Sequence, residues 1–146
     1  MKHLSSEEDQ RFRAEFEAGR FPPADFNHRA HIRLAYVYLC EHDPDTAHQR
    51  MRSALLSFLG HHGIDVSKYH ETMTRAWILA VEHFMENTPA AESSDVFIER
   101  NPRMLDAKIM MTHYSAEVLF SDEARARFVE PDLDPIPPIP RRGVDT

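Results

Sequence analysis

Apolar residues recur at helical spacing along most of this chain of 146 residues. The clearest stripe recurs every three or four positions and consists of Met73, Trp77, Ala80, Val81 and Phe84. Such spacing places the side chains on one face of an α-helix. Only four glycines are present, and no two alternating segments are joined by a hairpin turn. The pattern therefore predicts an all-α fold, a single-domain bundle of about five to seven helices.

Capping residues and helix breakers set the predicted helix boundaries. Ser5 and Glu8 fit a capping box for a first helix, which Gly19 ends. Asn27 fits the N-cap of a second helix, which runs to about Glu41 and is apolar almost all round. Further helices are predicted from the break at 43–45 to 60, from about 67–70 to 87, across 96–98, from 101 to 113, and as short turns over 116–120 and 122–128.

The end of the chain is rich in proline, beginning at Pro131. Proline lacks a backbone N–H and has a fixed φ, so this stretch cannot be a helix or a central strand. Residues 1–130 are the predicted bundle domain. Residues 131–146 are predicted to be an extended tail that packs on this domain or leaves it.

Composition excludes several classes of protein. The formal charge of -7, without clustered Lys and Arg, argues against nucleic-acid binding, which depends on neutralising phosphates. The chain start lacks the apolar core of a signal peptide, and no apolar run approaches the length of a membrane span. We therefore expect no membrane partner and a cytoplasmic location. Cys40 is the single cysteine, so neither an intramolecular disulfide nor a cage of thiolates around a metal can form.

Two polar motifs stand at predicted helix starts. The first runs from Phe26 to His31 with the sequence FNHRAH, and the second runs from Tyr69 to Thr74 with the sequence YHETMT. His28 and His31 are three residues apart and share a helix face. Helix bundles build ligand and metal sites from such inward-facing side chains. Structural explanations remain open as well, because a capping residue or a hydrogen-bonded core histidine needs no ligand.

The charged residues of these motifs also have two interpretations each. Arg29 lies where the helix dipole disfavours a cation, so we expect compensation by an acid such as Asp25 or by an anionic ligand. Glu71 is either an ordinary first-turn acid or a partner that orients a neighbouring histidine. His113, at the end of a predicted helix, is favourable there as a cation without any ligand.

Motifs of well-known chemistry are missing. The sequence has no glycine-rich phosphate loop, no Gly-x-Ser-x-Gly elbow and no His-Glu-x-x-His zinc helix. It also lacks the paired Glu-x-x-His of di-iron bundles. A nucleotide cofactor, serine-type acyl transfer and a two-metal centre therefore have no support.

The motifs together resemble a set of uncharacterised small bacterial all-helical proteins. The resemblance rests on FNHRAHIRLA from Phe26, YHET from Tyr69, the pairs Tyr114-Ser115 and Ala124-Arg125, and Pro131-Asp132-Leu133. It covers about residues 12–140. It implies a common fold and a common set of positions, but no established activity that could be transferred.

The leading hypothesis is a pocket between the second and fourth helices that binds a small polar or anionic metabolite. His70 would transfer protons, with Glu71 or His31 as its partner, and Arg29 would anchor negative charge. Turnover of the bound metabolite by acid–base chemistry extends this hypothesis. The other expected ligand contacts are His28, Tyr69, Thr72, Thr74 and His113.

Two alternatives remain open from the sequence. The first is a site for one divalent metal ion, with His28, His31 and His70 as ligands suited to zinc, iron or nickel. The second is a non-catalytic interaction module whose proline-rich tail binds a partner or straps its own bundle. Neither the substrate nor the oligomeric state follows from the sequence.

Overall fold

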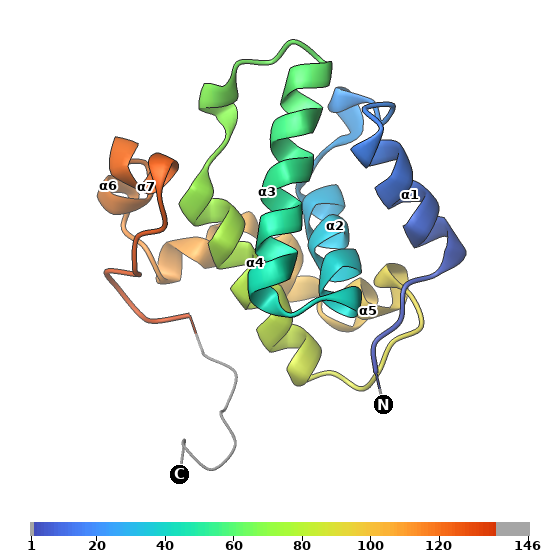
Figure 1. Cartoon of the computed structure of the whole chain (residues 1–146). Coiled ribbons are helices and arrows are strands. Elements are labelled where there is room, and N and C mark those ends of the chain that lie inside the picture. The colour runs from blue at the N-terminus through green and yellow to red at the C-terminus, as the bar shows by residue number, and fades with distance from the viewer. Residues whose placement is uncertain (1, 137–146) are drawn as a thin grey trace.

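The computed structural model describes residues 2–136 of the chain (Figure 1). Seven α-helices and four short 3-10 helices, joined by loops, lie within these residues. The α-helices are α1 (Glu7–Glu17), α2 (His28–Glu41), α3 (Pro44–His61), α4 (Glu71–Glu86), α5 (Ser94–Arg100), α6 (Ala116–Leu119) and α7 (Asp122–Ala126). The 3-10 helices are η1 (Pro23–Asp25), η2 (Val66–Lys68), η3 (Pro102–Leu105) and η4 (Ala107–Thr112). No strand occurs in the described residues, so the prediction of an all-α single-domain fold is confirmed.

Helix α2 lies at the centre of the bundle. It packs against α1, α3, α4 and α5, which surround it in Figure 1. Its residues Ile32, Leu34, Ala35, Tyr36 and Val37 have no exposed surface, so this helix is covered on several sides. The apolar character of the segment all round its axis predicted this central position correctly.

Side-chain caps begin α2, α6 and α7 where the sequence predicts them, whereas α5 is capped by Ser93 rather than by the predicted Ser94 or Asp95. Asn27 accepts a hydrogen bond from the Ala30 N–H, and Ser115 and Ser121 cap α6 and α7 in the same way. The cap of α1 is one residue later than predicted, because Ser6 and Asp9 form the capping box. The hydroxyl of Ser5 instead accepts a hydrogen bond from the Gln10 side chain.

One predicted helix is wrong. Residues 101–113 form η3 and η4 rather than one α-helix. Asp106 lies between them in an extended conformation, and its carboxylate accepts the Lys108 N–H as a new cap. The break changes which side chain is buried, because Met104 is fully buried and Leu105 is 41% exposed.

The chain beyond α7 runs back along the end of η4. The Leu133 N–H donates to the His113 carbonyl at 3.0 Å, and the Asp134 N–H donates to the Thr112 carbonyl at 3.3 Å. Ile136 packs against the hydrophobic core. The rest of the predicted tail, residues 137–146, lies outside the described residues. Among residues 2–136, no helix has the length and apolar character needed to cross a membrane.

Candidate functional site

The two polar motifs meet at one cavity, which we call the chamber. It lies between the first turns of α2 and α4 and the second half of α3, and it has a volume of about 260 Å³. Its lining residues are Phe26, His31, Leu55, Phe58, Leu59, Lys68, Tyr69, His70, Met73 and Thr74. The structure thus brings together His31 from the first motif with Tyr69, His70 and Thr74 from the second.

Aromatic and aliphatic side chains form most of the chamber wall. The rings of Phe26 and Phe58 lie 5.5 Å apart between centroids, and both contact the buried ring of Phe16. The His31 ring stands perpendicular to the Phe26 ring at 6.1 Å. A predominantly apolar wall with a few polar groups is typical of small-molecule sites.

His31 is a polar group of the chamber without a hydrogen bond to any other residue in 2–136. Burial, with a smaller contribution from His28, lowers the pKa of His31 to about 4. The ring is therefore neutral at pH 7 and offers one N–H donor and one lone pair. This combination suits hydrogen bonding to a ligand, whereas a pKa of about 4 makes the ring a weak proton acceptor at pH 7.

His70 lines the chamber, but both of its ring nitrogens bind backbone groups. Its Nδ1 accepts the Met73 N–H at 3.0 Å and thereby caps α4. Its Nε2 lies 2.6 Å from the Leu119 carbonyl, so the neutral ring donates from Nε2. Burial lowers the pKa of His70, which is consistent with this neutral form. The ring joins α4 to α6 instead of presenting a free nitrogen to the chamber.

Two hydroxyl groups of the chamber wall are also engaged. The Thr74 hydroxyl donates to the His70 carbonyl at 2.8 Å. The Tyr69 hydroxyl donates to Oε1 of Glu71 at 2.5 Å. Each oxygen keeps a lone pair that can accept a further hydrogen bond. Lys68 is exposed and makes no ion pair within the described residues. The pKa of the nearby Asp65 is lowered mainly by its hydrogen bond from the Ser67 N–H, and the charge of Lys68 adds to this effect.

Glu71 faces away from the predicted partner His70. Its carboxylate is buried and pairs with Arg52 of α3 through two hydrogen bonds. His48 Nε2 lies 3.3 Å from Oε2 of Glu71, without the geometry of a hydrogen bond. Burial raises the pKa of Glu71, but Arg52, Tyr69 and His48 outweigh it and lower the pKa below its ordinary value. Glu71 therefore reaches the chamber only through the Tyr69 hydroxyl.

Arg29 and His28 lie elsewhere on α2 and do not line the chamber. The Arg29 guanidinium pairs at 3.0 Å with Asp95 of α5, so its acidic partner is not the expected Asp25. The His28 ring packs edge-on against Trp77 at 4.7 Å, and its Nε2 lies 2.8 Å from the Met104 carbonyl. Both side chains hold helix α2 to its neighbours.

Thr72 and His113 also have structural partners outside the chamber. The fully buried Thr72 hydroxyl donates to the Arg127 carbonyl at 2.8 Å and accepts the Val129 N–H at 3.0 Å. His113 Nδ1 lies 2.8 Å from the Asp134 carbonyl. These two residues tie the segment after α7 to the bundle.

The three histidines of the metal alternative do not form a joint ligand set. His28 and His70 each have a backbone carbonyl as a partner, and only His31 and His70 line the chamber. Across residues 2–136, no group of three or more His, Cys, Asp or Glu side chains is arranged to hold a metal ion.

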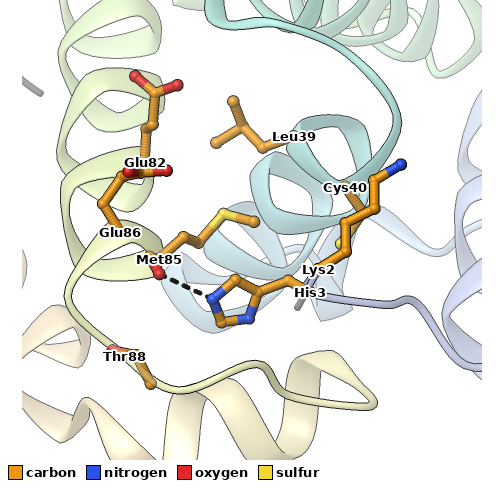
Figure 2. Close-up of a pocket in the computed structure, with 8 residues that line it drawn as sticks. All are labelled: Lys2, His3, Leu39, Cys40, Glu82, Met85, Glu86 and Thr88. Carbon is orange, nitrogen blue, oxygen red and sulfur yellow. Dashed lines mark hydrogen bonds between the residues drawn. The ribbon is translucent and has the colours of Figure 1, made fainter. Parts of the chain in front are cut away.

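A second cavity of about 350 Å³ opens between the N-terminal segment, α2 and α4 (Figure 2). Glu82 and Glu86 lie on its α4 wall, and Lys2 and Cys40 lie across from them. Burial, together with Glu86, raises the pKa of Glu82. None of the predicted site residues lines this acidic cleft.

The sequence interpretation missed the contribution of α3. Leu55, Phe58 and Leu59 form a wall of the chamber, and Arg52 binds Glu71. Their helical spacing predicts a buried face but not the cavity that this face covers. Lys68 was missed because it precedes the second motif by one residue and is a solvent-exposed cation by type.

Comparisons of the chain with protein-family models, with curated proteins and with solved structures found no match.

Proposed function

We propose that this protein binds a small molecule in the chamber, with His31 as the group that recognises it. One observation carries the proposal: His31 is a neutral, half-buried imidazole that faces an apolar cavity without a partner in residues 2–136. Small-molecule sites are typically apolar cavities with a few polar groups, and the free ring nitrogens of His31 can hydrogen-bond to a ligand there.

Acid–base turnover in the chamber would begin at His31 rather than at His70. The lone pair of His31 is free, whereas both nitrogens of His70 bind backbone groups. The pKa of about 4 makes the His31 ring a weak base, so its role as a hydrogen-bonding group is favoured over proton removal. Tyr69 connects the chamber to the buried Glu71 carboxylate. In this proposal His70 and Thr74 shape the start of α4, and Tyr69 accepts a hydrogen bond from the ligand.

Methionine methyl groups allow the proposal to be tested cavity by cavity. Met73 lines the chamber, Met85 lines the acidic cleft, and Met110 lines a third cavity beside η4. Protein labelled with ¹³C-methyl methionine would be screened against a library of small molecules by NMR. We expect binders that shift the Met73 signal while the Met85 and Met110 signals stay in place.

Substitution of two histidines separates recognition from folding. His31→Gln should weaken these binders at least tenfold, because the side-chain amide cannot reproduce the imidazole geometry. His70→Asn should weaken binding less than His31→Gln does, because asparagine is a good N-cap for α4 and His70 has no ring nitrogen free for a ligand. His113→Gln, outside the chamber, is the matched control. A screen in which no compound shifts Met73, or in which His31→Gln binds as well as the unmodified protein, would contradict the proposal.

A further inference from the structure

The charge of the chamber wall differs from that of the whole protein. The chain carries 24 acidic residues and a formal charge of -7, yet no Asp or Glu lines the chamber. Its one lining side chain with a full charge at pH 7 is Lys68, since its two histidines have lowered pKa values. We infer that the ligand of the chamber is a small organic acid, with its anionic group at Lys68 and its apolar body against Phe26 and Phe58. This inference rests on the function proposed above.

Lys68 is placed to receive such an anion. It belongs to η2, directly before the second motif, and its side chain lies at the chamber and is exposed. It forms no ion pair with an acidic residue in the described part of the chain. The nearby carboxylate of Asp65 is engaged at the Ser67 N–H, where it caps η2. The ammonium group can therefore pair with a ligand without first breaking an internal ion pair.

The helix directions favour the same sign of charge. Helices α2 and α4 both begin beside the chamber, with His31 in the first turn of α2 and Met73 and Thr74 in the first turn of α4. The N-terminal end of a helix carries a partial positive charge. Helix α3 lines the chamber with residues near its C-terminal end, which carries a partial negative charge. The chamber therefore lies near two positive helix ends and one negative helix end.

The size and polarity of the chamber restrict the rest of the ligand. Its volume of about 260 Å³ lies just below the range of roughly 300–1,000 Å³ that holds drug-sized molecules. Five of its lining side chains are apolar, namely Phe26, Leu55, Phe58, Leu59 and Met73. His31 and the Tyr69 oxygen supply one or two hydrogen bonds near this apolar wall. A compact hydrophobic molecule with a single acidic group fits the small volume, the apolar wall and the small number of hydrogen-bonding groups.

Two other cavities do not share this charge pattern. The acidic cleft contains two carboxylates and one lysine, so it repels anions. The cavity between Arg52 and Arg125 also contains Glu71 and Asp122, so its charges balance. The cavity beside η4 also contains a cationic side chain, Arg103, and no carboxylate, but its histidines His83 and His113 each have a hydrogen-bond partner. The unpartnered imidazole of His31 distinguishes the chamber from that cavity.

Three probes with one body and different charges test the inference. Phenylacetate, phenylacetamide and phenethylamine would be titrated into the full-length protein, with the Met73 methyl signal as the readout. We expect phenylacetate to bind about two- to fivefold more tightly than the neutral amide, as an ion pair with an exposed lysine predicts. The cationic amine should bind most weakly. Raising the salt concentration should reduce only the advantage of the acid.

A lysine variant locates the anionic group. Lys68→Met should reduce the affinity for phenylacetate to that for phenylacetamide, and Lys108→Met, an exposed lysine on η4, should change neither. If the amide or the amine binds as well as the acid, the inference about the acid is wrong while the proposed binding function stands. If no probe of any charge shifts Met73, the inference about the acid is overturned, and the library screen described above decides the proposed binding function.

Discussion

Asp9 is the residue on which three helices depend. The residue is 1% exposed, and its carboxylate accepts four hydrogen bonds: from the Ser6 N–H, from the Ser94 N–H and hydroxyl, and from Arg33. These contacts join α1 to α2 and α5. Burial raises the pKa of Asp9, but the hydrogen bonds from Ser94, Ser6 and Arg33 outweigh it and lower the pKa. A buried charge that is fully hydrogen-bonded is costly to replace.

Asp9→Asn should lower the free energy of unfolding by about 2–3 kcal/mol at pH 7, because Arg33 and the Ser94 hydroxyl lose a charged acceptor. Urea denaturation followed by circular dichroism measures this change. Glu15→Gln, at an exposed position on the same helix, is the control, and it should change the free energy of unfolding by close to zero.

The pH dependence of the unfolding free energy gives a second measure of how much the Asp9 carboxylate stabilises the protein. Because its pKa is lower in the folded protein, its stabilisation is present above the unfolded pKa of about 3.9 and is lost as the pH falls through the folded value. The gap in stability between the unmodified protein and Asp9→Asn should therefore narrow below about pH 4. An unchanged gap at low pH would show that the carboxylate charge does not contribute.

Cys40 should be a slowly reacting thiol despite its place on the acidic cleft. Burial raises its pKa to about 11, with Asp9 and Glu41 adding to the effect. Only the thiolate is nucleophilic, so little reactive form exists at pH 8. Reaction with a disulfide reagent at pH 8 should be at least tenfold slower in the native protein than in urea. Equal rates in both conditions would contradict the stated environment of Cys40.

At the scale of elements, capping residues predicted helix starts better than apolar patterns predicted helix type. Asn27, Ser115 and Ser121 were correctly identified because their hydrogen bonds are local to the sequence. The segment 101–113 has helical spacing at Leu105 and Ile109 but forms two 3-10 helices. A cap at Asp106 and the burial of Met104 decided that outcome, and the second depends on tertiary packing.

The candidate site was predictable only in part for the same reason. The leading hypothesis placed His31 and His70 at one pocket between the second and fourth helices, and both line the chamber. The separate partners of His70 and Glu71 were not foreseeable, because Leu119 and Arg52 are distant in sequence. Adjacent residues at a helix start point in different directions, so YHET supplies a cap, an ion pair and a buried hydroxyl rather than one catalytic cluster.

Thr72→Val tests how the last helices are attached to α4. Valine has nearly the same shape, but it leaves the Arg127 carbonyl and the Val129 N–H without their shared partner. We expect a loss of about 2–3 kcal/mol in unfolding free energy and faster amide exchange in α7. Thr112→Val, at an exposed position, should change stability by about 0.5 kcal/mol or less. Equal effects of the two variants would contradict this role for Thr72.

At the scale of the whole molecule, the two ends of the described chain are both fastened to the bundle. The His3 ring bonds to the Met85 carbonyl at 2.7 Å, as Figure 2 shows, and accepts the Ala91 N–H at 3.1 Å. Near the other end, the Asp132 carboxylate accepts the Ser115 N–H at 2.9 Å. The non-helical segments before α1 and after α7 therefore contribute to the stability of the bundle.

Truncation at the proline-rich stretch tests the contribution of residues 131–136. A chain of residues 1–130 should fold but lose about 2 kcal/mol relative to a chain of residues 1–136, which keeps every described contact of this segment. Urea denaturation of both chains measures the difference. Equal stabilities would show that these contacts contribute nothing, and complete loss of folding would show an essential strap.

The chamber is assembled from three parts of the sequence: the start of α2, the second half of α3 and the start of α4. It exists only when all three have packed, so a ligand that occupies it binds the native state and not the unfolded chain. By mass action, a ligand at a hundred times its dissociation constant adds about 2.7 kcal/mol to the native state. The melting temperature of the unmodified protein is therefore itself an assay, and it can rank candidate ligands before any reaction is known.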